Sequence, residues 1–562
     1  MWSNDNFILA PKEINKARKR LLVSFVFIFS IFVGIFSQII SFPFQDKSKF
    51  LLTDQLVKND FRAKIIDRND NILAINVPAW TMYADPKEVL EPDKTAKFLH
   101  NLMPEKDLKT LKTKLTLKKR FVEIDRVSSP KRYQAIFNSG ITGIHFMKIQ
   151  TRVYPKGNLA SHILGNVGRD GFGLAGIERK FDNVLKSSEK SLKLTINSNI
   201  QYILQTEIEK QIDFFEADAG AGIILSIKNG EILGLSSFPS FDVNYFGEAS
   251  INERFNRATF GSYDMGSTFK LINTAIALDS GIVKLEDRFD TTKPLYIGKH
   301  KVDDFKYLKK PANVAEILIN SSNIGSALIA EKVGAKVQKN YFDLLELTKK
   351  PDLPLLEISQ PIFNHRWTRS NSMTASYGYG LAVSPIQLAS AIACIFNNGN
   401  FIKPKLIIDN KKTIKKNVFT KNTSLIMRKL ARAVVIHPDG SGKKSDAFGY
   451  FVGGKTGTAE LIDKNGGFQK HLNLSSFVGA FPINDPQYLI LVLIEKPKPQ
   501  IEKLHHHFTT GGQVAAPVVK EIVNKIAPIL NIHPIVTDLP KIEQALKLDL
   551  ISNEVRLTNA SF

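Results

Sequence analysis

The stretch from Gly222 to Leu235 reads GIILSIKNGEILGL. Its apolar first half predicts a buried strand, the pair Asn229-Gly230 predicts a tight hairpin turn, and residues 231–235 predict the returning strand. Two more apolar runs of strand length, Ser476–Phe481 and Tyr488–Ile494, stand late in the chain. Because helical patterns separate the two strand pairs, we expect strands from both ends of this region to join one antiparallel sheet flanked by helices. The sequence therefore predicts an α+β domain.

The composition excludes several classes of protein. The chain has 562 residues, of which 43% are hydrophobic, and this is enough apolar material for packed cores and excludes wholesale disorder. A single cysteine excludes an intrachain disulfide framework and a multi-cysteine metal cluster. The formal net charge of +22 indicates either an anionic partner or a lysine-rich genome, and composition leaves both open.

The N-terminal region contains a candidate membrane anchor. Residues 21–40 read LLVSFVFIFSIFVGIFSQII, and no charged residue occurs between Arg20 and Asp46. Twenty helical residues span about 30 Å, the thickness of a bilayer core. A cleavable signal peptide has a shorter apolar region, so we expect an uncleaved transmembrane helix over residues 21–42.

The cations beside this segment predict its orientation. Five of them precede it: Lys12, Lys16, Arg18, Lys19 and Arg20. The more cationic side stays in the cytoplasm, so we expect a cytoplasmic tail at residues 1–20 and a single-pass protein with the rest of the chain in the periplasm of a bacterium. Because DNA is absent from that compartment, we expect no nucleic-acid partner.

The rest of the chain divides into three regions by composition and residue pattern. Residues 47–190 are rich in lysine, with a hairpin predicted by the runs Ala63–Asp67 and Ile72–Ile75. Residues 192–528 have the pattern of an enzyme domain. Residues 529–562 have mixed charge and are expected to form a loosely ordered tail.

The sharpest chemical motif is Gly266-Ser267-Thr268-Phe269-Lys270, which opens an apolar helical pattern. Ser267 then lies at a helix N-terminus, where free N–H groups favour developing negative charge. Lys270 lies three residues on, on the same helix face, and a neutral amine there can take the serine proton. Alone this motif is weak, since serine is a common helix cap.

Two later motifs strengthen it. Ser321-Ser322-Asn323 lies between two helical runs, where Ser321 can relay protons and Asn323 can bind a substrate amide. Lys455-Thr456-Gly457-Thr458 follows an apolar run that ends in Gly453-Gly454 and leads into a strand edge, where these glycines let substrate backbone approach. The lysine and hydroxyls of the motif suit a carboxylate. The backbone N–H groups of Ser267 and Thr458 are candidates for an oxyanion hole. Chance production of all three motifs in this order is far less probable than of one.

These motifs, S-x-x-K, S-x-N and K-T-G, resemble the active-site signature of penicillin-binding proteins and serine β-lactamases. The blocks Ser376–Gly380 and Gly511–Pro517 look like further blocks of that family, and Arg152–Pro155 and Gly173–Glu178 resemble motifs of the non-catalytic module of its class B members. The resemblance implies an anchored, multidomain α+β protein: residues 47–190 form an extended, β-rich pedestal of the dimerisation type, and residues 192–528 form the transpeptidase domain.

The resemblance also implies a function. Within class B, the form of the motifs looks most like the division-specific peptidoglycan D,D-transpeptidases, which cross-link stem peptides of the septal wall through a serine acyl-enzyme and are inhibited by β-lactams. It implies Ser267, Lys270, Ser321 and Lys455 as catalytic residues, with Asn323, Thr456, Gly457 and Thr458 binding substrate. The implied substrate is a stem pentapeptide on lipid-linked or nascent glycan strands, and the implied partners are a SEDS-family glycosyltransferase and other division proteins. No cofactor is expected.

Three alternatives stay open: an elongation-specific enzyme, a scaffold that recruits division proteins without catalysis, and a β-lactamase or β-lactam sensor. The intact motif residues disfavour the scaffold, and a β-lactamase or a sensor does not need the long module before Leu192.

Two other features have simple structural explanations. Cys394 lies among apolar helical residues and is expected to be a packed core thiol. Consecutive residues rarely converge on one ion, so His505-His506-His507 predicts a solvated loop, and no metal site is expected.

Overall fold

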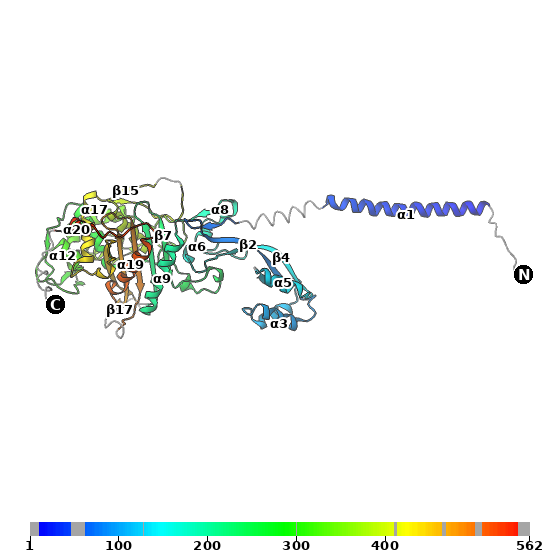
Figure 1. Cartoon of the computed structure of the whole chain (residues 1–562), viewed down its shortest axis with the longest axis horizontal. Helices are drawn as coiled ribbons and strands as arrows, with labels where there is room; N and C mark the ends of the chain where they lie inside the picture. The colour runs from blue at the N-terminus through cyan, green and yellow to red at the C-terminus, as the bar shows by residue number, and fades with distance from the viewer. Residues whose placement is uncertain are drawn as a thin grey trace. The chain divides into compact units, whose positions relative to one another are not determined.

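The computed structural model describes residues 11–45, 62–127, 129–298, 300–409, 413–462, 468–500 and 508–548. Helix α1 (Pro11–Gln45) contains the predicted anchor, and its segment Arg18–Ser37 is long and apolar enough to cross a membrane (Figure 1). Its apolar side chains from Leu21 to Phe36 are exposed, as lipid-facing side chains are.

The chain forms two compact units. One comprises residues 1–61 and 78–151, and the other comprises residues 62–77 and 152–562. The first and last described parts of the predicted module at 47–190, residues 62–77 and 152–190, belong to the larger unit. Two buried ion pairs explain this packing: Glu178 accepts hydrogen bonds from Arg62 (2.6 Å) and Arg152 (2.7 Å) within the larger unit.

The smaller unit has its own core. Its elements are the second half of β2 (Ile72–Ala84), α3 (Pro92–Leu102), α4 (Leu108–Leu115), β3 (Val122–Val127), α5 (Pro130–Asn138) and β4 (Ile144–Val153). Strands β2 and β3 pair antiparallel, with Trp80 opposite Val127. Asp107 and Ser129 cap α4 and α5 through their side-chain oxygens, which accept backbone N–H groups of the first turn.

The predicted hairpin near residue 67 is confirmed in the larger unit. Strand β1 (Ile65–Ile66) pairs antiparallel with the start of β2 and parallel with β5 (Leu192–Lys193). The Asp67 carboxylate closes the turn by accepting the backbone N–H groups of Asn69 (2.8 Å) and Asn71 (2.9 Å). Short helices α6 (Ser161–Leu164), α7 (Gly176–Lys180) and α8 (Asp182–Ser187) complete this region.

The catalytic region is organised by a five-stranded antiparallel sheet in the order β16-β17-β18-β6-β7. Its strands are β6 (Ala219–Ser226), β7 (Ile232–Phe238), β16 (Gly453–Ile462), β17 (Phe468–Phe481) and β18 (Tyr488–Glu495). The predicted hairpin pairs β6 with β7, and β18 from the end of the region pairs with β6, with Leu491 opposite Ile223. The expectation that both ends of the region join one sheet is confirmed.

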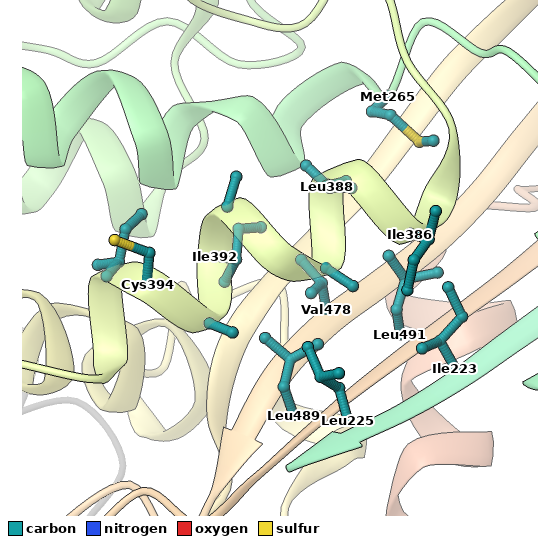
Figure 2. Packing of buried hydrophobic residues seen from close by; sticks show 14 of the residues in the cluster. Ile223, Leu225, Met265, Ile386, Leu388, Ile392, Cys394, Val478, Leu489 and Leu491 are labelled. Carbon is teal, nitrogen blue, oxygen red and sulfur yellow. The ribbon is translucent and has the colours of Figure 1, made fainter. Parts of the chain in front are cut away.

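Both faces of this sheet are buried, which explains why its strands read as continuous apolar runs. Ile224 and Ile490 face the core under α9 (Ser198–Phe214) and α19 (Gly511–Ile526). Their neighbours Ile223 and Leu489 face the opposite core, against α16 (Pro385–Phe396), as Figure 2 shows.

Most of the remaining helices in the described part of the chain pack around that second core, whereas the four-residue helix Ile251–Arg254 has no buried residue. They are α10 (Ile251–Arg254), α11 (Phe269–Asp279), α12 (Val314–Ile319), α13 (Asn323–Val333), α14 (Ala335–Leu344), α15 (Arg369–Ala375), α17 (Lys421–Ile436) and α20 (Leu539–Leu546), with 3-10 turns η1 (Val243–Tyr245), η2 (Gly266–Thr268) and η3 (Lys443–Ser445). Four two-stranded ribbons pair β8 (Arg288–Phe289) with β11 (Ala312–Asn313), β9 (Leu295–Ile297) with β10 (His300–Val302), β12 (Ile362–Phe363) with β13 (Leu381–Ala382), and β14 (Asn400–Phe401) with β15 (Lys416–Asn417).

The C-terminal segment differs from the loosely ordered tail expected at 529–562. It contains α20, and Leu546 and Leu548 are buried in the main core. Residues 549–562 lie outside the described part. Because the segment has mixed charge, its few apolar residues gave no clear signal in the sequence. They are nevertheless enough to pack one short helix against the core.

Candidate active site

The predicted nucleophile lies on a tight turn. Ser267 belongs to the 3-10 turn η2, which leads directly into α11. Gly266 before it has φ +56°, and a Cβ there would lie 2.7 Å from the carbonyl oxygen of Thr458, so only glycine fits. Ser267 is half-buried, whereas Phe269 and Lys270 are buried. The turn therefore leaves Ser267 partly exposed, whereas the first residues of the helix that follows are buried.

Lys270 connects the first two motifs. Its Nζ lies 3.1 Å from Ser267 Oγ, 2.5 Å from the backbone oxygen of Ser321, 3.2 Å from Ser321 Oγ and 2.7 Å from Asn323 Oδ1. The carbonyl and amide oxygens can only accept, so they take two amine N–H groups. The third position of the amine then faces the serine hydroxyls, and in a neutral lysine this position is the lone pair.

A carboxylate positions the second motif. Asp304 accepts hydrogen bonds from Ser322 Oγ and from the backbone N–H of Asn323 and of Ile324 (3.1 Å), at the junction between α12 and α13. Ser321 is held at φ +58°, a left-handed conformation that is strained for serine. Strain of this kind persists only where surrounding contacts impose it, so Asp304 fixes the loop that presents Ser321 to the lysine.

Lys455 joins the third motif to the second. It lies on β16, an edge strand of the sheet, and is fully buried. Its Nζ lies 3.0 Å from Ser321 Oγ, 3.4 Å from Ser441 Oγ and 3.1 Å from the backbone oxygen of Thr456. Ser321 Oγ is thus shared between two lysine amines, and the chain of contacts runs without a break from Ser267 to Thr456.

Burial controls the protonation of both lysines. Desolvation first, and then the charge of Lys455, hold the pKa of Lys270 well below its usual value, while Asp304 acts in the opposite direction. Desolvation alone lowers the pKa of Lys455 to about 7. A neutral Lys270 beside a cationic Lys455 is the arrangement that gives one general base and one positive charge near neutral pH.

The rest of the third motif lies beside the nucleophile turn. Gly457 is enclosed, since a Cβ there would lie 2.4 Å from Ser476 Oγ and 2.9 Å from the backbone oxygen of Met265. Thr458 Oγ1 accepts the backbone N–H of Gly511 (3.1 Å), which leaves its own proton free to donate. Thr456 Oγ1 contacts Ser441 Oγ at 2.6 Å.

Two positions in this network carried no sequence signal that identified them. Ser441 lies before the strand of the third motif, and its only cue is the flanking pair Gly440 and Gly442. Asp304 lies in a lysine-rich stretch with no motif. Both enter the site through long-range contacts.

Two other expectations concern residues outside the network. Cys394 is buried in α16, where desolvation raises the pKa of its thiol, so it is a core residue as expected. His505–His507 lie outside the described residues. Among the residues that the structure describes, no group of three or more His, Cys, Asp or Glu side chains is placed to hold a metal ion.

Comparison with known proteins shows similarity along most of the chain. The model of the penicillin-binding protein transpeptidase domain matches residues 220–524, and that of the penicillin-binding protein dimerisation domain matches residues 59–213. The probable peptidoglycan D,D-transpeptidase FtsI of Caulobacter vibrioides is 34% identical over 484 residues, 84% of this chain and 82% of that protein. Stage V sporulation protein D of Bacillus subtilis is 30% identical over 576 residues, 92% of this chain and 86% of that protein.

A solved structure has the same fold. The crystal structure of penicillin-binding protein 3 from Mycobacterium tuberculosis, complexed with aztreonam, matches with a TM-score of 0.66 at 20% identity, covering 85% of this chain and 98% of that one. At this identity the similarity concerns the fold.

Proposed function

This chain belongs to the penicillin-binding protein transpeptidase family, and we propose that it is a peptidoglycan D,D-transpeptidase that acts through an acyl-enzyme on Ser267. The observation that carries the assignment of residues is the position of Lys270 Nζ, 3.1 Å from Ser267 Oγ and 3.2 Å from Ser321 Oγ. This contact supports the proposal, because acyl transfer requires a desolvated amine between a nucleophile and a proton relay.

In the first step, Ser267 Oγ attacks the carbonyl carbon of the penultimate D-Ala of a stem pentapeptide. Lys270 takes the hydroxyl proton as the C–O bond forms, and the carbonyl oxygen becomes an oxyanion near the backbone N–H groups of Ser267 and Thr458. The C–N bond to the terminal D-Ala then breaks. The leaving amine receives its proton from Lys270 through Ser321 Oγ, which contacts both lysines.

The second step reverses these proton movements. An amine from a neighbouring stem peptide attacks the ester carbon, loses a proton through Ser321 to Lys270, and forms the new amide. The ester C–O bond breaks, and Ser267 Oγ regains a proton from Lys270. One cross-link forms and one D-Ala is released, with no net change in the enzyme.

The third motif holds the substrate in this scheme. The cation of Lys455 and the hydroxyls of Thr456 and Thr458 bind the terminal carboxylate of the stem peptide, and Gly457 lets β16 pack closely against the turn before Ser267. Asn323 Oδ1 accepts a hydrogen bond from Lys270 Nζ (2.7 Å) and its Nδ2 donates to the backbone oxygen of Asp303 (2.9 Å), so its amide positions Lys270, and in this proposal it also binds a substrate amide. A β-lactam carries a carboxylate and a strained amide in the same relation, and so acylates Ser267.

The same proposal includes a place and partners for the protein. The cationic residues before the apolar span support a cytoplasmic N-terminus and a periplasmic catalytic domain, anchored once in the inner membrane. The motifs and the similarity to FtsI support a role at the division septum. By resemblance to the division-specific transpeptidases, we propose a SEDS-family glycosyltransferase as the membrane partner that supplies nascent strands.

Two alternatives within the family are distinguishable. An elongation-specific enzyme would act along the lateral wall, so a septal rather than lateral position of a fluorescent fusion is the test of the division role. A scaffold would tolerate Ser267→Ala in cells, whereas a transpeptidase would not.

Labelling with a fluorescent penicillin tests the catalytic assignment. We expect the wild-type protein to be labelled and the Ser267→Ala variant to remain unlabelled, with Cys394→Ala as a matched control at a residue outside the site. Equal labelling of wild type and Ser267→Ala would refute Ser267 as the nucleophile. Absence of labelling in a folded wild-type protein would refute the activity.

A further inference from the structure

Two exposed aromatic rings from distant parts of the sequence meet near the active site. Phe305 is 93% exposed and Phe508 is 59% exposed, and their ring centres lie 5.8 Å apart in an edge-to-face arrangement. Neither ring takes part in the proposed catalytic steps. Single exposed apolar side chains are ordinary on a protein surface, whereas apolar side chains gathered there mark sites of interaction. The pair is therefore a candidate contact for a ligand.

The segment that carries Phe305 is bonded to the second motif. Asp304, the residue before it, accepts the backbone N–H of Asn323 on its carboxylate. Asp303 accepts Asn323 Nδ2 on its backbone oxygen at 2.9 Å. Both the backbone and the side chain of Asn323 are thus held by the two residues that precede Phe305. The amide assigned to substrate binding lies next to this segment.

The segment that carries Phe508 is bonded to the third motif. The backbone oxygen of Thr509 accepts Ser475 Oγ, and Ser475 lies opposite Thr458 in the pairing of β17 with β16. Gly511 N–H donates to Thr458 Oγ1 at 3.1 Å. The chain from Phe508 to Gly511 therefore runs beside the threonine that is assigned to substrate binding and to the oxyanion hole.

These contacts close a circuit around the space between the two motifs. On one side, Ser321 Oγ joins the second motif to Lys455 Nζ of the third at 3.0 Å. On the other side, the two phenylalanine rings join the segments bonded to the same motifs. A donor peptide that binds both Asn323 and Thr458 lies between those segments. The part of the donor that extends away from the catalytic groups is thereby brought against the rings.

We propose that Phe305 and Phe508 are specificity-determining residues, which bind the apolar part of the donor stem that precedes the penultimate D-Ala. An edge-to-face pair leaves ring faces open, and these faces can cover methylene groups of the donor. The inference rests on the proposed function, because Asn323 and Thr458 place the donor. Neither ring is needed for making or breaking a bond, so the pair selects among donors and leaves the proton transfers unchanged.

Two penicillins test the proposal on the full-length protein in detergent: 6-acetamidopenicillanic acid and 6-hexanoylamidopenicillanic acid. The acylamino group of a penicillin stands for the end of the donor chain, and the second compound differs only by four added methylene groups. Competition with a fluorescent penicillin measures the second-order rate constant of acylation for each. We expect the hexanoyl compound to react about tenfold faster, the gain from covering about two methylene groups. Equal rate constants in the wild-type protein would overturn the site.

Alanine variants assign this advantage to the rings. Phe305→Ala and Phe508→Ala should each reduce it and the double variant should abolish it, while the rate constant of the acetamido compound stays unchanged. A merely structural role would slow both compounds equally, so a double variant that keeps the wild-type ratio would contradict the proposal.

Tyr202→Ala is the matched control, because it removes an aromatic side chain that is 63% exposed on α9, and it should keep the full advantage. The same assay separates this inference from the function on which it rests. If neither penicillin acylates the folded wild-type protein, the proposed function fails and the ring site fails with it. If both acylate it with equal rate constants, only the ring site fails.

Discussion

Gly378 is the residue whose replacement tests most directly how the nucleophile turn is supported. Its φ is +89°, and a Cβ added there would lie 2.1 Å from the carbonyl oxygen of Gly266. Gly266 N–H in turn donates to the backbone oxygen of Gly378 at 3.2 Å. The two glycine backbones therefore touch directly, and Gly266 is the residue before Ser267. We predict that Gly378→Ala displaces Ser267 from Lys270.

The expected size of the effect follows from these distances. A Cβ contact becomes ordinary at 3.4 Å, so relieving a contact at 2.1 Å requires a movement of about 1.3 Å, and only backbone is available to move. Misplacing a reacting group by about 1 Å costs roughly 100-fold in rate. Gly378→Ala should therefore slow acylation by about 100-fold or more.

Gly380→Ala is the matched control. Gly380 has a similar φ of +82°, but a Cβ there meets only the Thr374 hydroxyl, at 3.5 Å. In both variants the backbone strain costs roughly 1–2 kcal/mol, and only Gly378→Ala adds the contact with the backbone of Gly266. The assay is the second-order rate constant of fluorescent penicillin acylation, corrected for folded fraction by thermal melting. Equal rate constants for the two folded variants would refute the reasoning.

Two other perturbations follow from the buried charges. Lys270 has a lowered pKa and must be neutral to act, so the acylation rate constant should fall as pH decreases through that pKa. Lys455 has a pKa lowered to about 7 and loses its cation above that pH, so the initial affinity for a β-lactam carboxylate should weaken above pH 7. Stopped-flow kinetics separates the two, and an affinity that stays constant above pH 7 would contradict the role of Lys455. Glu178→Gln removes the carboxylate that Arg62 and Arg152 share, which leaves Arg152 without an acidic partner among the described residues and Arg62 with Asp182 alone, and should lower the free energy of unfolding by about 3 kcal/mol. Chemical denaturation measures this, and a loss no larger than that from an exposed ion pair would refute it.

The sheet and the motif residues could be predicted because their signals are local. Asn229-Gly230 between two apolar runs specifies a hairpin whatever surrounds it, and the S-x-x-K spacing places Ser267 and Lys270 on one helix face. The division into compact units could not be predicted in the same way. It depends on Arg62 and Arg152 meeting Glu178, and no local pattern encodes that pairing.

The supporting residues of the site were missed for the same reason. Asp304 fixes the second motif through hydrogen bonds to residues about twenty positions away, and Ser441 reaches Lys455 from a loop. Neither residue type is unusual where it stands in the sequence. Only the folded arrangement shows that a carboxylate and a hydroxyl complete the network.

Ser321 shows why the three motifs must act as one unit. Lys270 and Lys455 both contact its hydroxyl, at 3.2 Å and 3.0 Å, so protons on both amines would place two cations around one oxygen in a buried site. Desolvation, and then the charge of Lys455, lower the pKa of Lys270, and one positive charge therefore favours a neutral base beside it. When a substrate carboxylate binds, it stabilises the proton on Lys455 and leaves Lys270 neutral for Ser267. Substrate binding and base activation are thus coupled through a single serine hydroxyl.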